Sequence, residues 1–459
     1  MKRINSLRIA LFMGCSLFFM ASCVKEGPMG PEGPIGAAGP AGKDGKDGQE
    51  TCKLCHNPSI VDQKAVEYQF SKHEYGEAAF EEAGNTGCTP CHAQEAFKYV
   101  CKNNVSAVFV KNPTTNKYSN PYSTTAGNAL GEFGCSTCHA NLHTTYGFTD
   151  FYPLTNTREV EMTMWGGVKK INVTPDNGVS NLCIKCHQPR PFVTSTTTSD
   201  GNVLDYTSLA AKPKDVFYDP ALTTNKITPA YRTHTHYGTA GAIYAGMGGV
   251  EFTGTLGYTN MVHTSKASCK DCHMASITGR AGGHTFKVRN GEGALTSTTS
   301  WNFNGCNTTD CHGTGTVTAS NAKYWTNPRA TIKGLLDEVA GKLKYNGIEI
   351  MNRNPDAEHN LWAGITTGNY DGYLNVYDPV NNPDGPANNP SGIFKNMGST
   401  SSWTQAQKDF NNSLQPIKLT NAQMGGLINF QMCLRDYSLG IHNYDYSKAL
   451  LTNTSAALN

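Results

Sequence analysis

A five-residue motif, Cys-x-x-Cys-His, occurs five times in this chain of 459 residues. The copies begin at Cys52, Cys88, Cys135, Cys183 and Cys269. A disulfide scaffold needs no His after each second Cys, and neither does a zinc ribbon built from Cys-x-x-Cys pairs. The full motif is typical of covalent attachment of a c-type heme. The repeats therefore predict a chain that folds around several bound cofactors.

The chemistry of heme attachment explains the spacing within the motif. Two thiols separated by two residues reach the two vinyl groups of one heme, and the His that follows lies beneath the iron as its proximal ligand. A looser sixth copy, from Cys306 through Cys311 to His312, has four intervening residues instead of two. We interpret it as an expanded motif for a sixth heme; the alternative is a disulfide or free thiols in a loop.

Six hemes of type c account for twelve of the 16 cysteines. The predicted thioether ligands are Cys52, Cys55, Cys88, Cys91, Cys135, Cys138, Cys183, Cys186, Cys269, Cys272, Cys306 and Cys311. The predicted proximal ligands of the iron ions are His56, His92, His139, His187, His273 and His312. Of the remaining cysteines, Cys15 and Cys23 lie near the N-terminus, and Cys101 and Cys433 either form a disulfide or stay free.

A second axial ligand on each iron distinguishes an electron carrier from an enzyme, because a vacant position admits a substrate. Eight of the 14 His are not proximal, which is enough to give six irons a second imidazole each. His234 and His236 point to opposite sides if their segment is extended, so that they could serve two different hemes. We expect His359 on the surface. The candidate distal ligands are His73, His143, His234, His236, His263, His284 and His442.

The N-terminus predicts export. Basic residues precede an apolar run at 9–19, a layout typical of a secretory signal peptide and too short to cross a bilayer as a mature helix. The residues before Cys23 resemble a bacterial lipoprotein box, which implies removal of 1–22 and lipidation of the Cys23 thiol. Cys15 is a weaker site because its apolar run is too short, and a simple signal peptide cut nearby is the alternative. We expect a lipid anchor in the bacterial cell envelope, at the outer membrane, facing the periplasm or the surface.

Residues 23–50 are predicted to form a tether behind this anchor. Gly recurs at every third position in eight triplets from Gly27 to Glu50, the pattern of a collagen triple helix, in which only Gly fits at the crowded axis. The segment is either an extended spacer, with about 3.1 Å per residue, or a stalk through which three chains form a trimer. In both cases it separates the membrane from the rest of the chain.

Residues 51–320 are predicted to form a hexaheme domain that is mainly α-helical with much irregular loop. All six motifs fall within 261 residues, so that the porphyrins must supply much of the core. The connections between motifs are rich in Thr, Asn, Gly and Ser, and we expect them to wrap a stack of hemes. Alternating apolar residues at 159–173 around Gly166-Gly167 predict some β-structure.

Residues 321–459 carry no Cys-His motif and are predicted to form a helical cover packed on the heme domain. An amphipathic helix is expected to start near Pro328, because apolar residues recur at 332, 335, 336, 339 and 343. Further helices are expected at 421–435 and from 444 to the C-terminus. His442 lies in the turn between them, from which it can reach back to a heme.

The stretch from His73 to His312, together with His442, resembles the multiheme c-type cytochrome superfamily, which includes the tetraheme partner of hydroxylamine oxidoreductase, pentaheme nitrite reductase and octaheme relatives. The resemblance lies in the order of His263, the fifth motif, His284 and a last Cys-His motif. It implies that His73, His263, His284 and His442 are distal ligands. It also implies hemes stacked in alternating parallel and perpendicular pairs. The nitrite reductases usually have Lys at one proximal position, whereas all six motifs here end in His.

These observations predict a multiheme cytochrome that carries electrons along a chain of about six hemes at the cell envelope or cell surface. Its expected partners are the membrane, through the lipid anchor, and other redox proteins or extracellular electron acceptors and donors. Lys plus Arg (38) nearly balances Asp plus Glu (36), which excludes a strongly basic nucleic-acid-binding protein. We therefore expect an electron carrier, without a catalytic residue of its own, more than a substrate-converting enzyme.

An enzyme is the alternative: a multiheme reductase or oxidase of a small nitrogen or sulfur oxyanion, with one open iron position. Such an enzyme needs donors above the iron that stabilise charge developing on the substrate. One cluster in the sequence could supply them, consisting of Tyr231, Arg232, His234, His236 and Tyr237.

Overall fold

The computed structural model of the chain describes residues 48–75, 88–108, 110–111, 113–114, 118–119, 131–165, 168–189, 204–223, 225, 227–291, 300–354, 366–382 and 392–459. The predicted signal peptide, Cys15, Cys23, most of the predicted tether and His359 lie outside these ranges. The chain divides into two units, Met1–Glu50 and Thr51–Asn459, and the description below concerns the second. Among the described helices, none is long and apolar enough to cross a membrane.

Each of the five Cys-x-x-Cys-His motifs overlaps a short helix. These are α2 (Gly48–Cys55), α6 (Thr89–His92), α9 (Cys135–Cys138), α10 (Asn181–Ile184) and α14 (Cys269–His273). Other short helices lie between the motifs, namely α3 (Val61–Tyr68), α4 (Lys72–Tyr75), α7 (Gln94–Lys102), η1 (Phe148–Phe151), η2 (Thr163–Trp165), α11 (Tyr206–Ala211), α12 (Ala240–Tyr244), α13 (His263–Lys266) and η3 (Gly283–Thr285). Helices of one or two turns are unstable in isolation, so their stability depends on what packs against them.

The strands form two-stranded antiparallel ladders. They are β1 (Val110–Lys111) with β2 (Tyr118–Ser119), β3 (Val160–Glu161) with β4 (Lys170–Ile171), β5 (Val216–Tyr218) with β10 (Leu419–Thr420), β6 (Lys344–Tyr345) with β7 (Ile348–Glu349), and β8 (Met351–Arg353) with β9 (Tyr370–Leu374). The β-structure predicted at 159–173 is confirmed, because Val160 pairs with Ile171. Its Gly166-Gly167 turn lies outside the described residues.

The prediction of a mainly helical chain is too strong. The described residues are a mixture of helix, short strand and much loop. The physical reason lies in the long connections, whose backbone amides and carbonyls need partners wherever they are buried. Short ladders provide those partners locally. The further expectation, a fold wrapped around hemes, is taken up below as a proposal.

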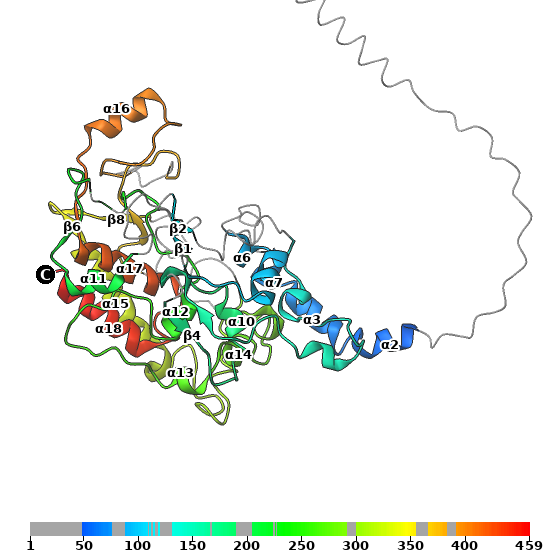
Figure 1. The fold of residues 1–459 in the computed structure, drawn as a ribbon. Coiled ribbons are helices and arrows are strands. Elements are labelled where there is room, and N and C mark those ends of the chain that lie inside the picture. The colour runs from blue at the N-terminus through cyan, green and yellow to red at the C-terminus, as the bar shows by residue number, and fades with distance from the viewer. Residues whose placement is uncertain are drawn as a thin grey trace, which may run out of the picture. The chain divides into compact units, whose positions relative to one another are not determined.

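The three longest helices lie in the C-terminal region, as the sequence predicts. They are α15 (Asn327–Lys342), α17 (Asn421–Arg435) and α18 (Tyr444–Ala457), which pack against one another, and Figure 1 shows them close together. The π-helix η4 (Ala322–Thr326) precedes α15, and α16 (Gln405–Ser413) precedes α17. The start of α17 is set by a capping box between Thr420 and Gln423, in which each side chain accepts a hydrogen bond from the other residue's amide.

One hydrophobic core joins these helices to the middle of the chain. Ile332 and Leu336 of α15 and Phe430 of α17 share it with Met162 and Phe252, and all five are at most 1% exposed. The segments that carry the first and third motifs differ. In the described residues 48–75 and 131–155, no hydrophobic side chain is buried. These segments contribute nothing to the protein core, so something other than apolar side-chain burial must hold them in place.

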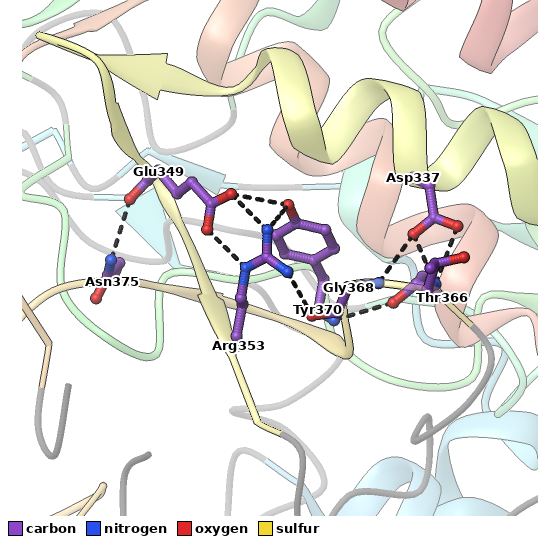
Figure 2. A network of polar contacts seen from close by, with 8 residues as sticks. Asp337, Glu349, Arg353, Thr366, Gly368, Tyr370 and Asn375 are labelled. Atoms are coloured by element: carbon purple, nitrogen blue, oxygen red, sulfur yellow. Dashed lines mark hydrogen bonds and ion pairs between the residues drawn. The ribbon is translucent and has the colours of Figure 1, made fainter. Parts of the chain in front are cut away.

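A polar network ties α15 to the strands that follow it (Figure 2). Arg353 donates to both carboxylate oxygens of Glu349, at 2.7 and 2.6 Å, and to the Tyr370 hydroxyl at 2.7 Å. The hydrogen bonds from Arg353 lower the pKa of Glu349, although burial opposes the shift. Asp337 of α15 accepts from the Thr367 amide at 2.8 Å. The network therefore fixes β7, β8 and β9 against the C-terminal helices.

Cys101 and Cys433, the two cysteines outside the motifs that fall in the described residues, are both free thiols. Cys101 is buried on α7 in a small cluster with Phe97 and Val100. Cys433 is buried on α17 in the main core. Cys101 and Cys433 do not form a disulfide in this structure, because their side chains belong to separate hydrophobic clusters.

Truncation of Leu336 tests the position of the main core. The side chain is 0% exposed, so we expect Leu336→Ala to lower the free energy of unfolding by about 2–5 kcal/mol, through lost burial and a residual cavity. Leu222→Ala is the control, because Leu222 is 46% exposed and its loss should change stability by no more than about 0.5 kcal/mol. Denaturant unfolding of both variants measures the difference, and equal costs would contradict this core.

Candidate functional site

Four of the five Cys-x-x-Cys-His motifs are closed by one backbone hydrogen bond, and the fifth lies within a single helix, α14. The amide of the His donates to the carbonyl of the first Cys, four residues earlier, as in one turn of an α-helix. The donor–acceptor distances are 2.8 Å for His56 to Cys52, 3.1 Å for His92 to Cys88, 3.0 Å for His139 to Cys135 and 2.9 Å for His187 to Cys183. The bond brings the two thiols and the imidazole to one short turn, which is the arrangement that attachment of a single heme requires.

The sixth motif is closed by the same pair of atoms in spite of its insertion. The amide of His312 donates to the carbonyl of Cys306 at 3.1 Å, across six residues instead of four. The extra residues form a turn in which the amide of Cys311 donates to Thr308 at 3.2 Å. The insertion therefore widens the loop but leaves the His at the same place relative to the first Cys.

Every motif His lies beside one other His ring. The distances between ring centroids are 5.9 Å for His56 and His143, 6.3 Å for His92 and His236, 6.4 Å for His139 and His284, 6.0 Å for His187 and His73, 6.1 Å for His273 and His442, and 5.9 Å for His312 and His263. Six motifs thus have six different partners, all at nearly the same separation.

This separation fits a metal ion between the two imidazoles. Two metal–nitrogen bonds of about 2 Å each, with roughly 1 Å from each nitrogen to the centre of its ring, add to roughly 6 Å. The angle between the two ring planes ranges from 18° for His56 and His143 to 85° for His73 and His187. Ligation through one nitrogen of each ring is compatible with this whole range, because the separation does not depend on the angle between the ring planes.

The structure thus places six of the seven candidate distal ligands beside a motif His. His143 lies only four residues after the third motif, yet its ring is beside His56 of the first. The seventh candidate, His234, is in a different setting, against Arg435 and Tyr373. Proximity along the sequence therefore does not identify which histidines pair.

The second ring nitrogen of several paired histidines faces a backbone carbonyl. The Nδ1 distances are 2.7 Å from His139 to Phe151, 2.8 Å from His273 to Phe286, 3.0 Å from His236 to Tyr237 and 3.3 Å from His263 to Ile441. A carbonyl can only accept, so Nδ1 carries the proton and the lone pair is on Nε2. Metal-binding histidines are oriented in this way.

Burial keeps several of these rings in the neutral form that binds metal. It lowers the pKa of His73, and with the neighbouring histidines it lowers the pKa of His187 to about 3. Only a neutral imidazole has a lone pair to donate to a metal ion. Their common environment therefore favours ligation over protonation.

His234 and His236 show how alternation along an extended segment gives two different surroundings. Arg435, a guanidinium that can only donate, has its Nη1 2.7 Å from Nδ1 of His234. The same Nδ1 lies 3.0 Å from the carbonyl oxygen of Thr235, so it is placed between a donor and an acceptor. The His234 ring packs against Tyr237 and Tyr373, whereas His236 lies beside His92. The expectation that both serve hemes thus finds a motif His beside His236, while the contacts of His234 are with Arg435 and the two tyrosines.

Arg435 was not expected from the sequence to belong to this site. It is 0% exposed, donates to the carbonyl of Thr235, and stacks over the rings of Tyr237 and Tyr373 at 4.7 and 5.2 Å. The two tyrosine hydroxyls are hydrogen-bonded to each other. No local pattern marks Arg435, because its partners lie about 200 residues earlier or in β9. Arg232, which the sequence suggested for the cluster, is exposed.

Several motifs touch one another through their thiols. The Cys186 thiol is in hydrogen-bond contact with the Cys91 thiol, and the Cys269 thiol with the Cys183 thiol. Burial and the nearby thiols of the sixth motif raise the pKa of Cys272 to about 12. The second, fourth, fifth and sixth motifs are therefore neighbours in space.

Comparison of the chain with protein-family models, with curated proteins and with solved structures finds no significant match. Within the described residues, no three side chains of His, Cys, Asp or Glu gather around a point that a metal ion could occupy. The ligands present come in pairs, and two is the number that an iron ion needs when a porphyrin supplies the other four.

Replacement of Arg435 tests its place in the Tyr237–Tyr373 cluster. We expect Arg435→Met to lower the free energy of unfolding by about 1–3 kcal/mol, because the buried Thr235 carbonyl loses its donor. Arg232→Met is the matched control and should leave stability within about 0.5 kcal/mol, since Arg232 is exposed. Denaturant unfolding of both variants provides the measurement. An Arg435→Met protein as stable as the control would show that the guanidinium is not held in this cluster.

Proposed function

We propose that the chain is a multiheme c-type cytochrome that carries electrons through six covalently bound hemes. The observation that carries this proposal is the presence of one further His beside each motif His, at 5.9–6.4 Å between ring centroids. A bound heme supplies an iron ion that gains and loses one electron. The chain supplies two thiols that attach each heme and two imidazoles that hold its iron.

The distribution of buried apolar side chains supports the same proposal. In the described residues 48–75 and 131–155 no hydrophobic side chain is buried, although each segment carries an attachment motif. A porphyrin is a large apolar surface, and its burial would give these segments the core that they lack. The helical C-terminal region, in contrast, shares a protein core with the middle of the chain, in keeping with a cover packed on a heme domain.

The contacts between motifs support transfer from one heme to the next. The thiol pairs Cys91 with Cys186 and Cys183 with Cys269 connect the fourth motif to the second and to the fifth. Hemes attached at adjoining thiols have adjoining edges, and electron transfer between them then needs no moving part. We propose that the fourth heme is an interior member of the chain, because its two thiols contact two different motifs.

The alternative of a reductase or oxidase requires an iron with an open position. The cluster that the sequence suggested for this role contains His236, which lies beside His92 and would fill that position. His234 and Tyr237 are engaged with Arg435. The arrangement favours the carrier.

We further propose that the protein works at the bacterial cell envelope, where it is anchored through a lipidated Cys23 and extended by the Gly-X-Y tether. A tether suits a carrier whose partners are other redox proteins or extracellular electron acceptors and donors. Trimer formation through the tether would place three heme chains together.

The spin state of the irons tests the six His pairs. We expect electron paramagnetic resonance of the oxidised protein to show six low-spin ferric hemes, because each iron has two imidazole ligands. His236→Ala should convert one of the six to high spin. His234→Ala is the matched control, two residues away, and should leave all six low-spin because the His234 ring is packed against Arg435, Tyr237 and Tyr373. A high-spin signal in the unmodified protein that shifts with nitrite or hydroxylamine would instead support the enzyme.

The mass of the mature protein tests the expanded motif. We expect a mass that corresponds to six hemes, and a loss of one heme in the double variant Cys306→Ala/Cys311→Ala. Cys101→Ala is the control and should retain six, because Cys101 is a buried thiol outside the motifs. A native protein with five hemes would remove the assignment of the sixth motif and leave the other five unaffected.

A further inference from the structure

One of the paired histidines has a carboxylate as the partner of its second ring nitrogen. Oδ1 of Asp436 lies 2.5 Å from Nδ1 of His442, and the Asp436 side chain is 1% exposed. The other oxygen, Oδ2, accepts a hydrogen bond from the hydroxyl of Ser438. Ser438 in turn accepts from the amide of His442 at 3.2 Å, so that the three residues form a closed set of contacts.

The position of Asp436 follows from the fold. It directly follows the last residue of α17, where its amide still donates to the carbonyl of Met432 at 3.1 Å. Asn443 begins α18 by accepting from the amide of Tyr446. The short turn between the two helices brings Asp436 and His442 together, and the His442 ring lies beside His273 of the fifth motif.

A carboxylate in this place changes the electronic character of the imidazole. The carboxylate can only accept, so Nδ1 of His442 donates its proton to Asp436. The lone pair of the ring is then on Nε2, where a metal ion can bind. Although burial opposes the shift, Asp436 raises the pKa of His442 above its ordinary value. A hydrogen bond to a carboxylate makes a metal-bound imidazole a stronger donor of electrons, and the charge itself is poorly screened where it is buried.

Histidines of other pairs have weaker partners. Nδ1 of His139, His236 and His263 faces neutral backbone carbonyls. His284 has a carboxylate nearby, that of Glu67, but its Nδ1 is 3.6 Å away and Glu67 is also paired with Lys64 at 2.7 Å. The negative charge next to His284 is therefore compensated and more distant.

We infer that Asp436 is a positioning residue that sets the reduction potential of the heme on the fifth motif below the potentials of its neighbours. The inference rests on the proposed function. An electron-rich axial imidazole and a buried negative charge both stabilise ferric iron relative to ferrous iron, and hydrogen bonding around the ligands is one of the means by which proteins tune heme potentials.

A lower reduction potential at the fifth heme would affect electron transfer because this heme lies between two others. Its two thiols are near the fourth motif on one side and the sixth on the other. An electron that passes between the fourth and sixth hemes along these contacts must therefore occupy the fifth. Asp436 makes the fifth heme harder to reduce. It thereby sets how often that heme is in the reduced state and the rate of electron transfer through it.

The test is a spectroelectrochemical titration of the full, heme-loaded protein and of Asp436→Asn. Asn has the same shape and keeps an acceptor for Nδ1 but has no charge. We expect one of the six midpoint potentials to move upward, with that heme roughly tenfold easier to reduce, which is about 59 mV for one electron. The other five should stay in place.

Asp445→Asn is the matched control. Asp445 is three residues from His442 and exposed at the start of α18, so that the same change of charge occurs without the hydrogen bond. It should leave all six potentials unchanged. An equal shift in both variants would contradict the inference, because it would show a general effect of charge.

Ser438→Ala provides a second variant with the opposite sign. It removes the donor to Oδ2, which leaves the carboxylate a stronger acceptor toward His442, so that the same midpoint should move downward. This variant decides the question if Asp436→Asn fails to fold. Six low-spin hemes with unchanged potentials in the variants would overturn the inference and leave the proposed function intact, whereas a protein without heme would overturn the proposed function itself.

Discussion

The pairing of imidazoles from distant parts of the chain is the interaction on which the rest of the structure depends. His73 is paired with His187, and His442 with His273, so that these two pairs join segments more than 100 residues apart. With an iron ion between the rings, each pair becomes a cross-link of two coordination bonds. Such cross-links restrict the unfolded chain in the way that closing a long loop does. The segments that bury no hydrophobic side chain of their own would depend on such cross-links most.

The C-terminal helices and the motif segments are stabilised by different means but meet at a few residues. Phe430 and Leu336 belong to an ordinary apolar core, which needs no cofactor. The end of α17, in contrast, carries Arg435 and Asp436, and both are directed at histidines. The end of one helix thus places two histidines in different surroundings. Arg435 packs against His234, and Asp436 accepts the Nδ1 proton of His442.

The sequence predicts those parts of this structure that depend on local spacing. Helical periodicity located α15, α17 and α18, and the Cys-His motifs located the short turns that hold them. Local spacing could not predict which histidines pair, because the pairing depends on the path of the chain in three dimensions. His143, for example, is close to His139 in sequence but lies beside His56. Asp436 and Arg435 carry no local signal either. The proportion of helix was overestimated because short ladders between loops leave little periodic trace.

The contact between the thiols of Cys91 and Cys186 has a consequence for assembly. In an oxidising compartment, two thiols in contact form a disulfide by exchange or oxidation. Such a bond would remove one attachment point from each of two motifs and leave two hemes held by a single thioether. On the proposed function, attachment of heme to both motifs would therefore have to precede the closing of this contact, so that the chain would receive these two hemes before this part of it folds.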